Sequence, residues 1–165
     1  RDADTHGLTG RDLAGSEPFA ARWDLFRDLR RQGPFLAHSA DVEDRFLRRQ
    51  WRTPGEVPDW SDPPAAGADW GPWLDSRGLA RAVRPRESAA LGDLIDAWEL
   101  GPELAECAER HCPPARRRRH AALFDALACA LAFRVVLEAR PDWGLRRVFR
   151  ESRGGSEISE QAWFF

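Results

Sequence analysis

Apolar residues recur at helical spacing in several segments of the chain. The first lies between a start signal at Ser16, which can cap free amides, and a stop at Gly33, so residues 18–32 are expected to form an amphipathic helix. Residues 120–139 form the longest and most apolar segment, which favours a buried helix. The same period predicts helices over residues 41–51, 88–100, 102–111 and, more briefly, 143–149.

Two short segments favour strands. Residues 34–38 (PFLAH) form a compact apolar run after a Gly-Pro turn and lead directly into the helix over 41–51. Residues 73–82 are expected to be a short strand edge or turn followed by a helical turn around Asp75, which we interpret as a helix cap or sheet-edge residue. A strand that leads directly into a helix ends at the kind of edge where open α/β sheets bind their ligands.

Residues 52–71 show no period and contain four prolines, three glycines and two tryptophans, which predicts an irregular loop. Loops longer than about 12–15 residues are uncommon unless they are functional or mobile. Trp60 and Trp70 indicate that this one packs against the rest of the fold. Residues 1–15 are also expected to be loop, and residues 151–165 a tail that ends in Trp163, Phe164 and Phe165, either packed or exposed for a partner.

The composition limits the class of protein. With 165 residues and 42% hydrophobic content, we expect one domain, or part of one. The chain has no methionine and opens on Arg1 in a charged stretch, so we expect a segment of a longer gene product, truncated at its N-terminus. Three cysteines without a CxxC pair, no leader and no long apolar run favour a cytoplasmic protein without membrane contact.

The formal net charge of −2 argues against a protein that coats nucleic acid through bulk charge. Contact with nucleic acid would have to be local. The arginine run at residues 116–119 directly precedes His120, where Arg118 and Arg119 are candidates for binding a substrate backbone. The alternative interpretation is a solvated surface segment.

His120 and Asp125 form the strongest candidate for catalysis. Their separation of five positions corresponds to about 500° of helical rotation, so the two side chains meet only if His120 lies at the mouth of the helix or on the preceding loop. A carboxylate on an otherwise apolar helix is costly to bury without a cation. The pair therefore indicates a carboxylate-held metal with a histidine nearby, against the alternative of a structural contact.

A second group of carboxylates, Asp41, Glu43 and Asp44, opens the helix over 41–51. The helix dipole favours acidic residues there, so only one of the three needs a function. Glu43 precedes Phe46 and Leu47 by three and four residues and is expected on the inward face, whereas Asp44 shares a side with Arg48. We favour Glu43, with Asp44 or Asp41 as alternatives.

Several motifs, in order, resemble the DEDDh family of 3′–5′ exonucleases, which includes the proofreading epsilon subunit of bacterial DNA polymerase III and ribonuclease T. HGLTG at residues 6–10 resembles the turn after the family's third strand. AHSA at residues 37–40 resembles the opening of its second exonuclease motif, and HAALFDA at residues 120–126 its third, the most specific part. The resemblance covers residues 6–137.

This resemblance implies a ribonuclease H-like mixed sheet flanked by helices, and hydrolysis of a DNA or RNA 3′ end to nucleoside 5′-monophosphates in proofreading, repair or RNA processing. It makes His120 the general base, Asp125 and Glu43 metal ligands, and His38 and Ser39 substrate contacts. The metals would be two Mg²⁺ or Mn²⁺ ions. Single-stranded nucleic acid, and a DNA polymerase, are the implied partners.

The sequence departs from the family in three places. The family has Asp where Glu43 stands and Asn where Ser39 stands, and its first motif, Asp-x-Glu on the first strand, has no counterpart ahead of residue 6. The fold is therefore expected to lack its first strands, and this segment alone to be inactive. A non-catalytic nucleic-acid or polymerase-binding module on the same fold is the alternative, and a helical scaffold a weaker one.

Overall fold

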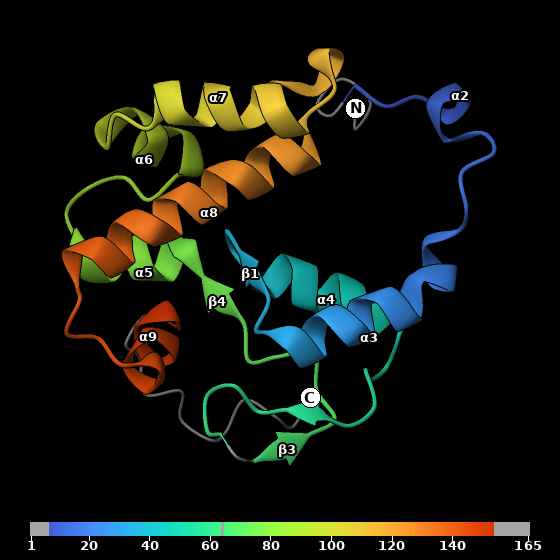
Figure 1. The fold of residues 1–165 in the computed structure, drawn as a ribbon, viewed down its shortest axis with the longest axis horizontal. Coiled ribbons are helices and arrows are strands. Elements are labelled where there is room, and N and C mark those ends of the chain that lie inside the picture. The colour runs from blue at the N-terminus through green and yellow to red at the C-terminus, as the bar shows by residue number, and fades with distance from the viewer. Residues whose placement is uncertain (1–6, 64, 154–165) are drawn as a thin grey trace.

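The computed structural model describes residues 7–63 and 65–153, and Figure 1 shows their arrangement. Helices make up most of this part of the chain, and the strands are only two residues long. The elements in chain order are α2 (Gly10–Leu13), η1 (Phe19–Arg22), α3 (Trp23–Gln32), β1 (Leu36–Ala37), α4 (Asp41–Gln50), β2 (Val57–Pro58), β3 (Ala66–Gly67), β4 (Leu74–Asp75), α5 (Ser76–Val83), α6 (Leu91–Ala97), α7 (Gly101–His111), η2 (Pro114–Arg116), α8 (Ala122–Ala139) and α9 (Leu145–Ser152).

The strands form two small sheets. β1 pairs with β4 in parallel, with Leu36 opposite Leu74 and Ala37 opposite Asp75. β2 and β3 form a short antiparallel pair inside the irregular segment. The fold is thus mixed α/β with a small sheet, which agrees with the expected α/β class. No helix in the described ranges has the length and apolar character needed to cross a membrane.

The sequence pattern predicts most elements with small shifts in their ends. The helix expected over 18–32 divides into η1 and α3, and the one expected over 88–100 is confined to α6. The loop expected over 1–15 contains α2, because Thr9 and Asp12 cap each other in a capping box. The tail expected from 151 begins later, since α9 continues to Ser152; residues 163–165 lie outside the described residues.

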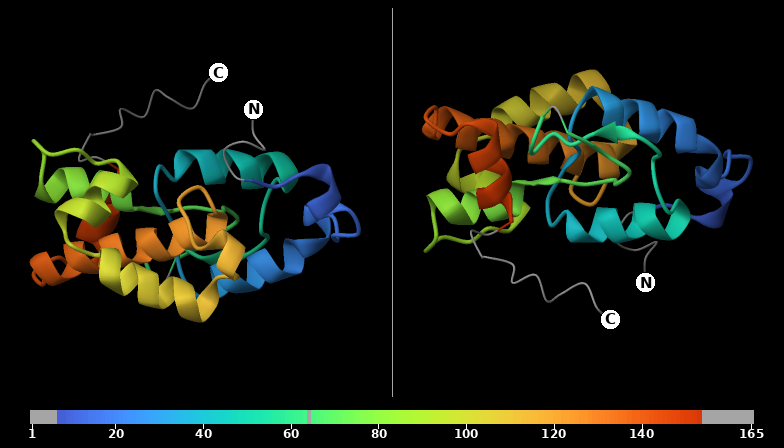
Figure 2. Two further views of the ribbon diagram at one scale, coloured as in Figure 1. Left: turned by 90° about the horizontal axis from the view of Figure 1, so that it is seen from above. Right: turned by 90° about the horizontal axis from the view of Figure 1, so that it is seen from below.

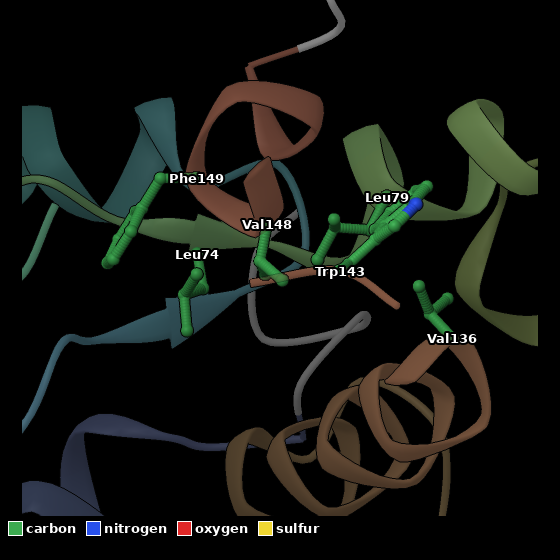
Figure 3. Close-up of a cluster of buried hydrophobic side chains, with 6 residues drawn as sticks. All are labelled: Leu74, Leu79, Val136, Trp143, Val148 and Phe149. Atoms are coloured by element: carbon green, nitrogen blue, oxygen red, sulfur yellow. The ribbon is translucent and has the colours of Figure 1, made fainter. Parts of the chain in front are cut away.

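Two hydrophobic clusters share helix α8. Figure 3 shows the first, in which side chains of β4, α5, α8 and α9 converge: Leu74, Leu79, Val136, Trp143, Val148 and Phe149. The second joins α6, α7 and α8 around Ile95, Leu104 and Leu131. Figure 2 shows α8 alongside α7, with α5 and α9 near the C-terminal end of α8. α8 is therefore the central element of the fold.

The segment over 52–71 is fixed by a buried arginine on α3. The guanidinium of Arg30, which is 1% exposed, donates to the carbonyl oxygens of Trp70 at 2.9 Å, Pro58 at 2.9 Å and Gly71 at 2.6 Å. In return the indole of Trp60 donates to the carbonyl of Arg30 at 3.0 Å. These bonds confirm that the segment packs against the fold.

Aromatic side chains extend the same attachment. Rings of η1, α3 and α4 gather around Trp51, on which Phe19 stacks with centroids 4.7 Å apart, and Trp51 in turn meets Trp70 of the segment with centroids 5.8 Å apart. Trp70 is completely buried, and its indole donates to the Trp51 carbonyl at 2.8 Å. The other members of this aromatic cluster are Phe26, Phe35, Phe46 and Trp73.

Replacing Arg30 with methionine is expected to lower the free energy of unfolding by about 3 kcal/mol, because three carbonyl oxygens lose a charged donor. Arg31→Met is the matched control, since Arg31 is exposed, donates to the Glu56 carbonyl at 3.3 Å and forms only a surface ion pair with Asp28 at 3.9 Å; it should cost less than about 0.5 kcal/mol. Urea unfolding followed by circular dichroism measures both, and equal losses would contradict the role given to Arg30.

Gly78 is the point where α5 and α9 touch. A Cβ at this position would lie 2.0 Å from the carbonyl oxygen of Ser152, so Gly78→Ala is expected to displace α9 and cost about 2 kcal/mol. Gly101→Ala is the control, because no atom lies within 4 Å of its Cβ; it should stabilise α7 by about 0.5 kcal/mol. Thermal unfolding of the two variants should shift in opposite directions.

Candidate functional site

The carboxylate of Asp75, at the end of β4, holds the starts of two helices. Its oxygens accept the backbone N–H groups of Ser39 and Ala40, each at 3.0 Å, at the start of α4. They also accept those of Arg77 at 2.9 Å and Gly78 at 3.4 Å, which begin α5. Asp75 is therefore a helix cap, as the sequence indicates, and its oxygens are occupied by amides.

A chain of hydrogen bonds runs beside this cap. The Nδ1 atom of His38 lies 2.9 Å from the Ser76 hydroxyl, which lies 3.2 Å from the Cys129 thiol on α8. The His38 ring also bonds to the backbone of Ala89, in a contact that favours the protonated ring. His38 is thus held by protein groups on both sides. Its expected role as a substrate contact gains no support from this arrangement.

Burial shifts the pKa values of the two titratable side chains in this chain of hydrogen bonds, His38 and Cys129. It lowers the pKa of His38, an effect that nearby Asp75 opposes and Arg77 and Arg81 reinforce. It also raises the pKa of the Cys129 thiol to about 11, against the bond from Ser76. Near neutral pH both side chains are therefore uncharged.

An open cavity of about 1410 Å³ lies between β1 and the helices α6, α7 and α8; we call it the α7–α8 cavity. Apolar side chains of the three helices form much of its wall, including Leu91, Leu104 and Phe124. Five residues singled out from the sequence also line it, and they come from segments far apart in the chain: His38, Glu43, Arg119, His120 and Asp125.

The three carboxylates that open α4 have different surroundings. Asp41 pairs with Arg45 at 3.1 Å, and Asp44 pairs with Arg48 at 2.6 Å while accepting the Trp73 indole at 2.8 Å. Glu43 alone among the three lines the α7–α8 cavity. Burial, followed by repulsion from Asp41 and Asp75, raises the pKa of Glu43 above its ordinary value. A cation beside Glu43 would offset that repulsion.

His120 lies on the turn before α8, as the five-residue spacing predicts. Its backbone has φ 66°, and its N–H donates to a carboxylate oxygen of Asp125 at 3.3 Å. This hydrogen bond holds the turn against the first turn of α8. Both residues line the α7–α8 cavity. The imidazole is exposed and the Asp125 carboxyl half-buried.

The arginines before His120 are largely engaged with the protein. Arg117 donates to the carbonyls of Cys112 at 3.1 Å and Glu109 at 3.0 Å, at the end of α7. Arg119 lines the cavity and pairs with Asp96 at 3.1 Å. Arg118 is exposed, and its guanidinium lies against the backbone of Gly7.

The side chains in the cavity do not form a metal site on their own. Glu43 and Asp125 offer the oxygen donors that Mg²⁺ and Mn²⁺ prefer. Yet nowhere in residues 7–63 and 65–153 do three histidine, cysteine or acidic side chains come close enough together to hold an ion. The residues described here therefore do not fit a complete metal centre, and further carboxylates would be needed.

Ser76 and Cys129 are two site residues that the sequence analysis did not identify. They lie 53 positions apart, and no local pattern connects them. Ser39 is placed at the cap rather than in the cavity: it has φ 69°, and its hydroxyl accepts a bond from Arg77 at 3.1 Å. A serine directly after a capping aspartate is the one signal that could have pointed to Ser76.

No protein-family model, curated protein or solved structure matches this chain.

The lowered pKa of His38 makes the stability depend on pH. Because the folded protein binds this proton more weakly than the unfolded chain, the stabilisation is complete above about pH 6.5 and is lost as the pH falls toward the folded pKa. Between pH 7.5 and 5.5 the wild type should lose stability faster than His38→Gln, by up to about 1.4 kcal/mol per pH unit.

Urea unfolding at pH 7.5, 6.5 and 5.5 measures that difference. An NMR titration of the His38 ring, assigned by its loss in the variant, checks the direction of the pKa shift independently. The same pH dependence in both proteins would contradict the prediction.

Proposed function

We propose that this protein provides the site of a metal-dependent 3′–5′ exonuclease on a ribonuclease H-like fold. The observation that carries the proposal is that Glu43, His120 and Asp125, from two distant segments, line one cavity beside the end of β1. These are the residues that the family resemblance assigns to the reaction. Their convergence does not follow from their positions in the chain.

The topology around the cavity supports the same proposal. Two parallel strands are connected through α4, and α8 packs against β1 and α5 (Figure 1). The site lies at the carboxyl end of β1, where open α/β sheets bind ligands.

The residues have separate tasks under this proposal. His120 takes the proton from an attacking water, a step for which an exposed imidazole can exchange protons with solvent. Divalent ions, when bound, would supply the positive charge that stabilises a phosphodiester during hydrolysis. Glu43 and Asp125 would contribute part of their ligands, and carboxylates beyond these two are required.

A second candidate function rests on the incomplete set of ligands. A non-catalytic module that binds nucleic acid or a polymerase would keep the fold and need no metal. Arg117 and Arg119 already bond to protein groups, so the arginine run does not offer free guanidiniums from both residues for binding phosphate. The presence of both His120 and Asp125 in one cavity favours the enzyme, because a binding module needs neither side chain.

The test is degradation of a 5′-labelled single-stranded DNA with MnCl₂, with RNA in parallel. Two forms of the protein are compared: the chain as printed, and the chain extended upstream through any in-frame Asp-x-Glu. In the extended form we expect stepwise loss from the 3′ end, reduced at least about 100-fold in His120→Ala, since a general base contributes at least that factor.

Asp125→Asn tests the ligand role, because asparagine keeps the shape and an acceptor for the His120 N–H. Asp142→Asn is the matched control, an exposed acid outside the cavity paired with Arg147 at 3.5 Å. Activity should fall in the first and persist in the second. A folded extended protein without activity would overturn the exonuclease and leave the binding module, which should bind DNA equally well with EDTA.

A further inference from the structure

Helix α5 carries a row of exposed arginines. Arg77 and Arg81 lie on the helix and Arg84 at its C-cap, and all three are exposed. Their spacing of i, i+4 and i+7 places them on one side of a helix, within about 60° of one another. At about 1.5 Å of rise per residue, the row is about 10 Å long. We call it the α5 arginine row.

The row differs from the other helical arginines in its lack of acidic partners. Every other described helix of eight or more residues that carries an arginine, namely α3, α4, α7, α8 and α9, has an ion pair between residues one turn apart. Helix α5 contains no acidic residue, and within the described ranges Arg77 and Arg81 form no ion pair. Arg84 pairs with Glu87 at 2.9 Å. Two adjacent positive charges of the row are therefore uncompensated.

The stability of the helix does not account for Arg77. A helix N-terminus carries a partial positive charge, so a cation in the first turn is unfavourable, and an arginine at i+4 adds repulsion. The neighbouring carboxylate of Asp75 accepts backbone N–H groups instead of pairing with the guanidinium. The Arg77 guanidinium donates to the hydroxyl of Ser39 at 3.1 Å. An anion bound across Arg77 and Arg81 would offset both unfavourable effects.

The row begins at the rim of the α7–α8 cavity. Helix α5 follows β4 directly, at the end of the parallel pair (Figure 1). Ser39, which Arg77 contacts, comes directly after His38, and His38 lines the cavity. Burial lowers the pKa of His38, and the positive charges of Arg77 and Arg81 lower it further, so both guanidiniums lie near that ring. The row therefore leads away from the cavity along α5.

The surrounding segment concentrates positive charge in a chain that is negative as a whole. Residues 76–92 contain four arginines and one glutamate, a net charge of +3, whereas the whole chain has a formal charge of −2. Guanidiniums bind phosphates through charge-assisted hydrogen bonds, and a row of them matches the repeating charge of a phosphodiester backbone. The row thus supplies the local positive surface that contact with nucleic acid requires in this chain.

From these observations we infer that the α5 arginine row binds the phosphates of a single-stranded nucleic acid whose 3′ end lies in the α7–α8 cavity. Arg77 contacts the phosphate nearest the cavity, and Arg81 and Arg84 follow the strand away from it. The direction of the strand rests on the proposed exonuclease function, whereas the binding itself needs neither metal nor hydrolysis. Contacts to phosphates hold the strand in place without selecting a sequence.

The test is binding of a 5′-fluorescein-labelled twelve-nucleotide oligothymidylate to the full chain in EDTA, followed by fluorescence anisotropy at several salt concentrations. The row variant combines Arg77→Gln with Arg81→Gln. The matched control combines Arg146→Gln with Arg150→Gln on α9, because these exposed arginines have the same spacing and each already pairs with an acid. A second oligomer, with the same bases on an uncharged methylphosphonate backbone, tests the need for phosphate.

We expect the row variant to bind the oligothymidylate at least about tenfold more weakly than the wild type. The slope of log affinity against log salt should be less steep by about 1.4, since each phosphate contact to a single strand contributes about 0.7. The control variant should stay within about twofold of the wild type, because its arginines are engaged in surface ion pairs. The methylphosphonate oligomer should not bind, and circular dichroism establishes that each variant is folded.

Equal losses in the two double variants would overturn the inference, because binding would then depend on overall charge alone. So would the absence of binding to the folded wild type. Displacement of the DNA by polyglutamate at an equal concentration of charge would also overturn it, and would identify an acidic polypeptide as the ligand. EDTA removes the metal, so none of these outcomes depends on hydrolysis: a protein that binds through the row without degrading DNA would overturn the exonuclease alone.

Discussion

The arrangement of the site depends on the Asp75 carboxylate. It accepts four backbone N–H groups, two at the start of α4 and two at the start of α5, while its own N–H donates to the hydroxyl of Ser152 on α9. The side chain and backbone of this one residue thereby join the ends of both parallel strands to three helices. A helix start supplies unpaired N–H groups and a partial positive charge, so this half-buried carboxylate satisfies two such ends at once. The position of Glu43, one turn into α4, follows from this cap.

The sequence predicts local features of the site well. The spacing of His120 and Asp125 requires the histidine to lie before the helix, and it does. The helical period separates Glu43 from Asp44, and the structure places only Glu43 in the cavity. Asp75 is recognisable as a cap, although not as the cap of a second helix that starts 34 residues earlier in the chain. Local patterns carry this information because neighbours on a helix or strand are fixed by its geometry.

The contacts that could not be predicted join residues far apart in sequence. Arg30 looks like one more surface arginine on α3, yet it is buried because carbonyls 28 to 41 residues away converge on it. Ser76 and Cys129 meet only because α5 packs across α8. Burying an arginine is favourable only where each of its N–H groups finds an acceptor, a condition set by the whole fold. The sequence therefore indicates the local position of each candidate residue better than it indicates the distant contacts that hold that residue in place.

The aromatic cluster has a spectroscopic consequence. The chain has eight tryptophans and no tyrosine, so its ultraviolet emission comes from indole alone. Five of these tryptophans, Trp23, Trp51, Trp60, Trp70 and Trp73, lie on α3 or within residues 51–73, and none of the five lines the α7–α8 cavity. Intrinsic fluorescence would thus report mainly on whether that half of the molecule is folded, and would be nearly silent about events in the cavity.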